Sequence, residues 1–280
     1  MPGIPTYDLS DKDFSYFSRL VYEKCGIHLH EGKKELVRSR LSKRLRELNF
    51  TGFSMYLQYL QGPGGEAELI FMLDAISTNL TSFFREKRHF EFLENEGLKN
   101  ITALMQREGR KELHIWSAGC STGEEPYSLG ICFSEALGAL SRFDVRILAT
   151  DLSTRVLETA QSGIYPEAKV AGLSQTLLHR YFLRGKGKRR GHVRVIPSLR
   201  DMIGFRRFNL MDPFPVALTF DVVFCRNVMI YFDKPTQEAL VGKFYNCLRP
   251  GGYLFIGHSE SLMGIEHRFR YVQPTIYLKS

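Results

Sequence analysis

The sequence predicts an α/β fold with a mostly parallel sheet that ends in an antiparallel hairpin, preceded by a small all-helical domain. Three observations carry this prediction. Strand and helix patterns alternate from residue 113 onward, whereas residues 8–75 show helical periodicity alone. The first strand, over 113–118, leads through a tight glycine loop into a helix that Pro126 opens, which is the first unit of a Rossmann-like fold.

The amino-terminal helices include one with a strongly basic side. On the helix expected over 33–48, apolar residues form one stripe, and Arg40, Lys43 and Arg46 fall on the opposite side. We expect this basic ridge to bind an acidic partner. The alternative is a solvated face that binds nothing.

A second basic segment lies in a hairpin that alternation and glycines predict over 181–196. Six basic residues and no acid lie between Arg184 and Arg194. The formal net charge of the chain is +8, which predicts an acidic partner surface.

The later strands of the sheet are short apolar runs. They are expected over 144–150, 205–209, 221–227 and 253–257, with a closing hairpin at 269–278. A mostly parallel sheet that ends in this way differs from the dinucleotide-binding fold and is typical of class I methyltransferases. The predicted domains are a helical domain at 1–76, a linker over the cleft at 77–95, and a methyltransferase domain at 96–280 with a β-subdomain insert at about 179–202.

The glycine loop after the first strand favours a cationic ligand. It holds Gly119 and Gly123 but no lysine, so it matches neither a P-loop nor a dinucleotide-binding motif. Glu124 and Glu125 would repel a pyrophosphate at the start of the helix. S-adenosylmethionine, which carries sulfonium and ammonium groups, fits such a loop. The alternative is that both glutamates only stabilise the helix.

Asp151 ends the second expected strand, where a carboxylate in such folds accepts from both ribose hydroxyls. The alternative role is to cap the next helix. Ser153 already offers that cap, so we favour ribose binding.

The composition indicates the kind of cellular compartment in which the protein works. Five scattered cysteines without a Cys-x-x-Cys pair indicate a reducing compartment with neither disulfides nor zinc. Eight histidines lack ligand spacing, so we expect no metal site. We find no signal peptide and no apolar run of about eighteen residues, and therefore expect a soluble cytoplasmic protein.

Five segments together carry a family resemblance: TNLTSFFRE, SAGCSTGEEPYS, ATDLSTRVLETAQSGIY, FCRNVMIYFDK and GHSES. They resemble the chemotaxis protein methyltransferases of the CheR type, and the resemblance covers nearly the whole chain. This family transfers the methyl group of S-adenosylmethionine to glutamate side chains of chemoreceptors. The resemblance implies the same activity here, a protein-glutamate O-methyltransferase in chemotaxis signal transduction.

The resemblance also implies functional residues. Its S-adenosylmethionine contacts would fall on Asn79, Thr81, Arg85, Glu125, Asp151, Asn209, Leu210, Arg226 and Asn227. In the family an arginine and a tyrosine lie near the transferring methyl group, and Arg85 and Tyr231 stand at those positions. We expect Arg85 to orient the acceptor carboxylate or the adjoining end of the cofactor, and Tyr231 to fix the methyl geometry.

The implied partner is the cytoplasmic helical region of the receptors, contacted by Arg40, Lys43 and Arg46. Some members also bind a receptor carboxyl-terminal peptide at the hairpin subdomain, which here presents Arg184, Lys186, Lys188 and Arg194. We expect a monomer.

Two alternative functions remain. One is a methyltransferase that acts on nucleic acid, which the charge suggests, although Asn227-Val-Met-Ile-Tyr231 lacks the prolines of base-methylating loops. The other is a non-catalytic scaffold that binds the cofactor.

Overall fold

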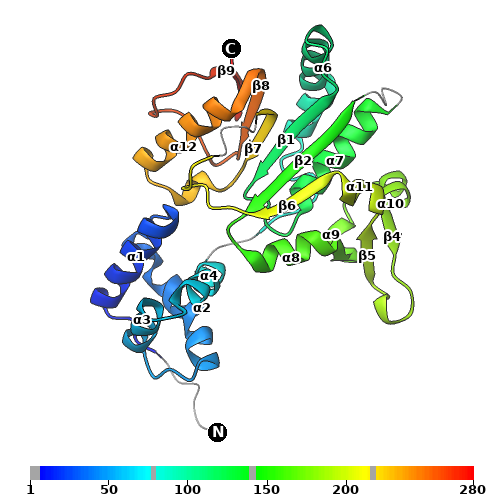
Figure 1. Cartoon of the computed structure of the whole chain (residues 1–280). Helices are drawn as coiled ribbons and strands as arrows, with labels where there is room; N and C mark the ends of the chain where they lie inside the picture. Colours follow the sequence, from blue (N-terminus) through cyan, green and yellow to red (C-terminus); the bar gives the residue numbers. More distant parts are fainter. Residues whose placement is uncertain (1–6, 77–79, 139–142, 215–218) are drawn as a thin grey trace. The chain divides into compact units, whose positions relative to one another are not determined.

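The computed structural model consists of two compact units (Figure 1). It describes residues 7–76, 80–138, 143–214 and 219–280. The first unit comprises Met1–Thr78 with Tyr231–Asp233, and the second comprises Asn79–Ile230 with Lys234–Ser280. Asn79 lies outside the described residues. No helix within these ranges is long and apolar enough to cross a bilayer.

The first unit is helical, as predicted. Its elements are α1 (Asp11–Cys25), η1 (Glu31–Lys33), α2 (Lys34–Glu47), α3 (Phe53–Gln61) and α4 (Gly65–Ile76). The Ser10 side chain caps α1 by accepting from the Asp13 N–H at 3.0 Å, and Gly26 ends the helix with a left-handed φ of 73°. The apolar stripes pack inward, with Phe17, Leu41 and Tyr56 fully buried.

A tripeptide from far along the chain belongs to this helical unit. Phe232 forms an isolated β-bridge with Ile27, and the backbone N–H of His28 donates to the Tyr231 carbonyl at 2.8 Å. The Tyr22 hydroxyl lies 3.0 Å from the Asp233 carboxylate, to which it donates. The first unit is therefore discontinuous in sequence.

The second unit is built on a mixed sheet whose described strands run in the order β6-β2-β1-β7-β8-β10-β9 (Figure 1). The strands are β1 (Glu112–Ala118), β2 (Asp144–Asp151), β6 (Ile203–Arg207), β7 (Phe220–Cys225), β8 (Leu248–Ile256), β9 (Arg270–Gln273) and β10 (Ile276–Leu278). From β6 to β8 the neighbours pair in parallel, and β10 pairs antiparallel with both β8 and β9. The predicted fold class is confirmed.

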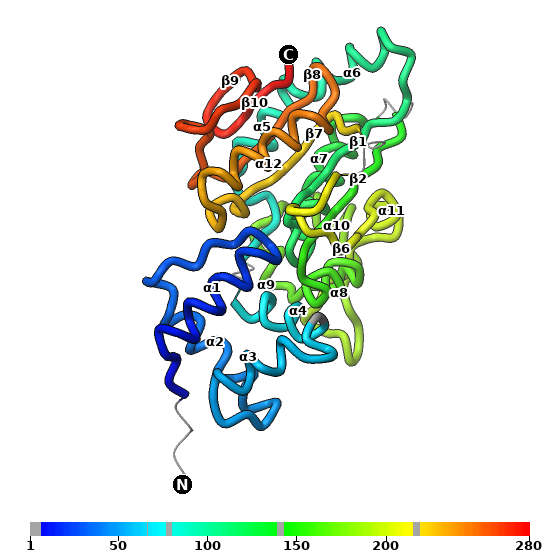
Figure 2. The backbone as a smooth tube through the Cα atoms, turned by 60° about the vertical axis from the view of Figure 1, so that its left-hand side comes forward, coloured from blue at the N-terminus to red at the C-terminus, as the bar shows by residue number. Residues whose placement is uncertain are grey.

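Helices cover both faces of this sheet (Figures 1 and 2). They are α5 (Arg88–Phe92), the π-turn η2 (Leu93–Gly97), α6 (Leu98–Arg107), α7 (Glu124–Leu137), α8 (Thr154–Ser162), α11 (Pro197–Asp201) and α12 (Lys234–Cys247). Neighbouring β1 residues point to opposite faces: Ile115 joins the buried cluster that includes Phe133 of α7, and Trp116 lies 5.5 Å from Phe244 of α12 between ring centroids.

A small antiparallel sheet, in the order β3-β5-β4, projects from this unit. Its elements are β3 (Ile164–Pro166), α9 (Glu167–Val170), α10 (Gln175–Tyr181), β4 (Phe182–Arg184), η3 (Gly187–Arg189) and β5 (His192–Val195). The predicted hairpin is present as β4 and β5. The sequence pattern does not predict β3, which pairs with β5 over only three residues.

Two strands end earlier than predicted. Strand β6 ends at Arg207, because the Asn209 side chain accepts from the Met211 N–H at 3.1 Å and turns the chain. Strand β7 ends at Cys225, and Asn227 follows with a left-handed φ of 59°. The polar residues expected at both strand ends therefore lie in loops.

Candidate active site

The candidate site lies at the carboxyl edge of the sheet, where β1 and β7 are neighbours. The chain leaves β1 for β2 and β6 on one side and returns to β7 on the other, which makes this the topological switch point. The loop after β1 requires its glycines, since Gly119 and Gly123 have φ values of 86° and 94°. A side chain at Gly119 would also meet Val228, whose Cγ2 lies 2.4 Å from the added Cβ.

Asp151 braces this loop. Its carboxylate accepts from the backbone N–H of Ser121 at 2.8 Å and from that of Ser153 at 3.0 Å. The Ser153 hydroxyl in turn accepts from the Val156 N–H, so Ser153 caps α8 as expected. Asp151 therefore lies at the end of β2 beside the glycine loop, where a carboxylate in such folds accepts from ribose hydroxyls.

The two glutamates that begin α7 have different environments. Glu124 is fully buried, 3.0 Å from the Lys169 ammonium group, and accepts from the Thr122 hydroxyl at 2.6 Å. Glu125 accepts from the Ser117 hydroxyl at 2.7 Å and is 13% exposed. Lys169 compensates the charge of Glu124, which leaves Glu125, the glutamate that the family resemblance selects, as the candidate for the cofactor.

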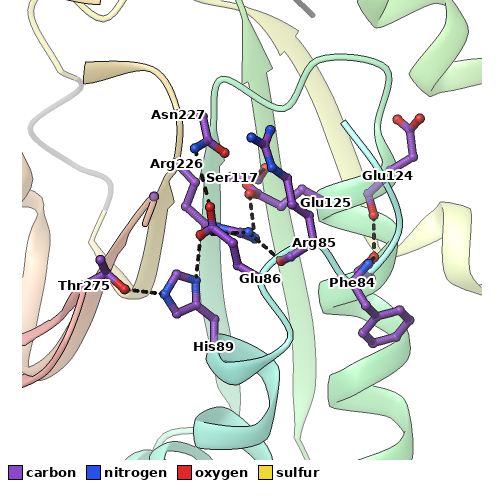
Figure 3. Close-up of polar contacts among 12 residues, drawn as sticks. Phe84, Arg85, Glu86, His89, Ser117, Glu124, Glu125, Arg226, Asn227 and Thr275 are labelled. Atoms are coloured by element: carbon purple, nitrogen blue, oxygen red, sulfur yellow. Dashed lines mark hydrogen bonds and ion pairs between the residues drawn. The ribbon is translucent and has the colours of Figure 1, made fainter. Parts of the chain in front are cut away.

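Arg226 connects the segments around the site (Figure 3). Its side chain is only 2% exposed and lies 3.1 Å from Glu86 and 3.3 Å from Glu125. It also donates to the backbone carbonyl of Arg85. The guanidinium thus joins the loop after β7 to α7 and to the segment before α5.

Glu86 is a member of this network that the sequence pattern does not predict. It has a left-handed φ of 58° and accepts from the Asn227 amide at 3.4 Å and the His258 N–H at 3.1 Å. Burial alone would raise the pKa of Glu86, but Arg226 and the His258 N–H bring it below its usual value. The segment TNLTSFFRE ends at Glu86, which is the signal that could have indicated it.

Burial shifts the pKa values of two neighbouring groups, Glu125 and His89, in opposite directions. It raises the pKa of Glu125, although Arg226 and the Ser117 hydroxyl oppose this. It lowers the pKa of His89 to about 3, with a further contribution from Arg226, so His89 is neutral. The His89 Nε2 atom lies 2.6 Å from the Thr275 hydroxyl.

Glu86, His89 and His258 form the candidate metal group among the described residues, with ligand atoms within 4.8 Å of one another. The Arg226 guanidinium lies 3.1 Å from the same Glu86 carboxylate. Its positive charge opposes a cation at this position, and we assign no metal to the group.

The structure connects most of the described residues that the family resemblance selects for the cofactor. Arg85, Glu125 and Asn227 meet through Arg226 and Glu86. The Thr81 carbonyl accepts from Lys169 at 3.2 Å, which links it to the start of α7. Asn209 and the buried Leu210 follow β6 beside Asp151, whose carbonyl accepts from the Phe208 N–H.

Tyr231 is assigned to the other compact unit. It belongs to the first unit, where its carbonyl accepts from the His28 N–H, whereas Arg85 belongs to the second unit. Its role beside the methyl group stays a prediction.

The basic ridge on α2 is smaller than predicted. Arg40 is half-buried and donates to the Ile76 carbonyl at 2.7 Å, because the end of α4 presents unpaired carbonyls there. Lys43 and Arg46 are exposed. The ridge available to a partner therefore depends on Lys43 and Arg46.

The basic residues of the small sheet gather around an open hollow of about 300 Å³. Arg184, Lys186 and Arg194 line it, and all three are exposed. Lys188 lies in η3 and is exposed as well. This concentration of positive charge fits an acidic peptide.

Comparison with known proteins identifies both parts of the chain. Residues 12–77 match the all-alpha domain of CheR methyltransferases, and residues 79–278 match the SAM binding domain of the same family. Chemotaxis protein methyltransferase 2 of Pseudomonas aeruginosa is 42% identical over 98% of this chain and 95% of its own length. The chemotaxis protein methyltransferase of Borreliella burgdorferi is 40% identical, covering 98% of this chain and 96% of the relative. The chemotaxis protein methyltransferase of Escherichia coli is 40% identical over 97% of this chain and 92% of its own length.

The predicted enzyme class and cofactor are confirmed by these matches, since they cover the cofactor domain and the helical domain alike. The chain belongs to the CheR methyltransferase family and is a methyltransferase that uses S-adenosylmethionine.

Proposed function

We propose that this chain transfers the methyl group of S-adenosylmethionine to glutamate carboxylates of chemoreceptors, in the cytoplasm, and thereby adapts chemotaxis signalling. The observation that carries the proposal is the match of nearly the whole chain to chemotaxis protein methyltransferases. A match confined to the cofactor domain would support methyl transfer without indicating the acceptor.

The carboxyl edge of the sheet suits the cofactor chemically. Glu125 offers a carboxylate to the cationic part of the cofactor, and Asp151 offers one to ribose hydroxyls. Bound S-adenosylmethionine supplies an electrophilic methyl group on its sulfonium. The further contacts that we assign to the cofactor are Asn79, Thr81, Arg85, Asn209, Leu210, Arg226 and Asn227.

The chain needs to position the acceptor more than to activate it. A glutamate carboxylate is already ionised at neutral pH, so no general base is required. Besides its cofactor contact, we assign Arg85 to the acceptor carboxylate: its guanidinium is anchored on the Leu80 carbonyl at 2.8 Å, and a guanidinium has further N–H donors. Tyr231 would hold the methyl geometry by packing or hydrogen bonding. Orientation of this kind accounts for much of the rate in such reactions.

The receptor would be bound through its acidic surface. Lys43 and Arg46 on α2 supply one basic area, and the hollow lined by Arg184, Lys186 and Arg194 supplies another. We propose that the helical methylation region docks on the first area, that a receptor carboxyl-terminal peptide docks on the second, and that the enzyme acts as a monomer.

The test uses methyl-labelled S-adenosylmethionine and membranes that contain chemoreceptors. Labelled receptor bands are treated with alkali, and we expect volatile methanol, because carboxyl methyl esters hydrolyse readily. The Arg85→Ala variant serves as the control and should label poorly at low receptor concentration. Alkali-stable label, or label on nucleic acid, would contradict the proposal. Cofactor binding without any transfer would favour the scaffold alternative.

A further inference from the structure

Glu260 is a buried carboxylate that holds two loops together. It is 8% exposed and lies in the loop after β8. One carboxylate oxygen accepts from the backbone N–H groups of Gly257 and Asn227, the latter at 2.9 Å. The other accepts from the N–H groups of Met229 at 2.7 Å and Ile230 at 3.3 Å. Three of these four donors come from the loop after β7.

The four donors occupy the acceptor sites that an ionised carboxylate has. Burial raises the pKa of Glu260, while the N–H groups of Gly257, Asn227, Met229 and Ile230 oppose the rise. A protonated acid, or an amide, would turn a donor toward one of these N–H groups and leave it without an acceptor. The arrangement therefore requires the charged side chain.

The two loops also fit each other closely at Gly257. A Cβ at this position would lie 2.5 Å from the Asn227 amide nitrogen and 2.9 Å from the Glu260 carboxylate. Asn227 itself has a left-handed φ of 59°, a conformation that asparagine adopts more readily than most other non-glycine residues. The Asn227 N–H donates to Glu260, which helps to hold the chain in this conformation.

The loop that Glu260 holds carries Arg226 and Asn227, which the family resemblance assigns to the cofactor. Arg226 and Asn227 begin it, and both contact Glu86. Displacement of this loop would disturb the contacts of Arg226 with Glu125 and with Arg85 as well. Glu260 acts on the site through backbone groups alone.

We propose that Glu260 is a positioning residue of the methyltransferase reaction, which fixes the loop 226–230 in the conformation that binds the cofactor. This inference rests on the proposed function for the reaction, but cofactor binding can test it without a receptor. The reason is that the loop contacts Glu125 and Arg85, which we assign to the cofactor, through Arg226.

The experiment compares Glu260→Gln and Glu260→Asp with the control Glu266→Gln, which changes an exposed glutamate in the same loop. The affinity for S-adenosylhomocysteine is measured by calorimetry, and amide hydrogen exchange is followed at Asn227, Met229 and Ile230. We expect Glu260→Gln to bind at least about tenfold more weakly, as when buried backbone donors lose their acceptor. Exchange should accelerate at the three amides and remain slow in β1. Glu260→Asp, which restores the charge on a shorter side chain, should lie between Glu260→Gln and the unchanged control.

Unchanged affinity in Glu260→Gln, with accelerated exchange in the loop, would overturn the inference. So would weaker binding in a folded variant whose amides at Asn227, Met229 and Ile230 exchange no faster than in the wild type. If Glu260→Gln does not fold, Gly257→Ala tests the same loop from its other side, and retained affinity there would also overturn the inference. A wild-type protein that binds cofactor but does not methylate receptors would contradict the proposed function and leave the inference standing.

Discussion

Two arginines, one in each unit, form ion pairs of different kinds. In the helical unit Arg44 forms a two-point pair with Glu68, with distances of 2.8 and 2.6 Å, and Glu68 is 3% exposed. The Tyr56 hydroxyl donates to the same carboxylate at 2.7 Å, and the guanidinium lies 4.5 Å from the centre of the Phe71 ring. This pair is bidentate, and the remaining contact of the guanidinium goes to Glu47 on the same helix at 3.1 Å.

Arg226 in the second unit divides its guanidinium between two other segments of the chain, the one that holds Arg85 and Glu86 and the start of α7. It contacts Glu86, Glu125 and the Arg85 carbonyl, and its carboxylate distances are 3.1 and 3.3 Å. No single partner satisfies it. The comparison indicates that Arg44 stabilises one unit, whereas Arg226 connects segments whose relative positions decide whether the site is formed.

The largest effect should follow from Arg226→Met. This change leaves Glu86 and Glu125 without their shared cation, and breaking a buried pair destabilises by about 3–5 kcal/mol. We expect kcat/KM to fall by at least about 100-fold, since small displacements in an active site reduce rates to this extent. Methyl transfer and thermal unfolding are measured together, with Arg226→Lys as the charge-matched control. Activity near the wild-type level in Arg226→Met would contradict the proposal that Arg226, unlike Arg44, is needed to form the active site.

Arg44→Met should affect stability and leave the chemistry unchanged. Glu68 would remain buried without its cation, so we expect the free energy of unfolding to fall by roughly 3 kcal/mol. The affinity for S-adenosylhomocysteine should stay within about twofold of wild type, because Arg44 contacts none of the residues assigned to the cofactor. Denaturant unfolding and calorimetry measure the two quantities. The double variant Arg44→Met, Glu68→Gln should recover part of the stability, and a further loss in it would contradict the pairing.

His89, which faces Glu86, Arg226 and His258, should give the second unit a pH dependence. Its pKa of about 3 in the folded protein lies below the ordinary value of 6.5, so the unfolded chain binds a proton that the folded protein excludes. The free energy of unfolding should therefore fall as the pH decreases below 6.5, by up to about 1.4 kcal/mol per pH unit.

The His89→Gln variant should lose most of this slope. The difference between variant and wild type at pH 6 and pH 5 isolates the histidine. Glu86 has a lowered pKa and loses its contribution only below the ordinary carboxyl range, and the opposite slope from Glu125 and Glu260, whose pKa values burial raises, is common to both proteins. Equal slopes in the variant and the wild type would show that His89 is not the group that titrates.

The smallest effect should come from Lys43, the exposed neighbour of Arg44 on α2. Lys43→Gln should leave stability unchanged and raise the KM for receptor by about two- to threefold, as expected for one exposed charge at an interface. Initial rates at varied receptor concentration measure this, and Lys24→Gln is a control on α1. A loss of stability without a change in KM would show that Lys43, like Arg44, stabilises the helical unit and does not bind the receptor.

The parts of the fold that the sequence predicts are those determined locally. The alternation after residue 113 and the Gly119 loop predict the mostly parallel sheet and the cofactor edge, because strand ends in a parallel sheet meet at one edge. The end of β6 was predicted wrongly because Asn209 makes a side-chain turn that apolar periodicity does not record. Helical spacing placed Arg40 on the exposed side of α2, but it cannot show that the end of α4 lies there.

The connecting residues were harder to predict for a related reason. The family resemblance selects Arg226, but no pattern predicts Glu86 or Glu260, which contact Arg226 and Asn227 from more than thirty residues away. A carboxylate that accepts from backbone N–H groups leaves no spacing pattern, because its partners can be residues of any type. Only the folded chain brings such donors together.

The tripeptide Tyr231–Asp233 has a consequence for how these domains can be exchanged between relatives. In a chimera that takes only residues 1–78 from a relative, the relative's residues at positions 22 and 27 would have to pair with Phe232 and Asp233 of this chain. The transferable module is therefore the helical segment together with its distant tripeptide. Natural recombination at a single junction would separate the two, so exchange of this domain requires either matched tripeptides or a second crossover.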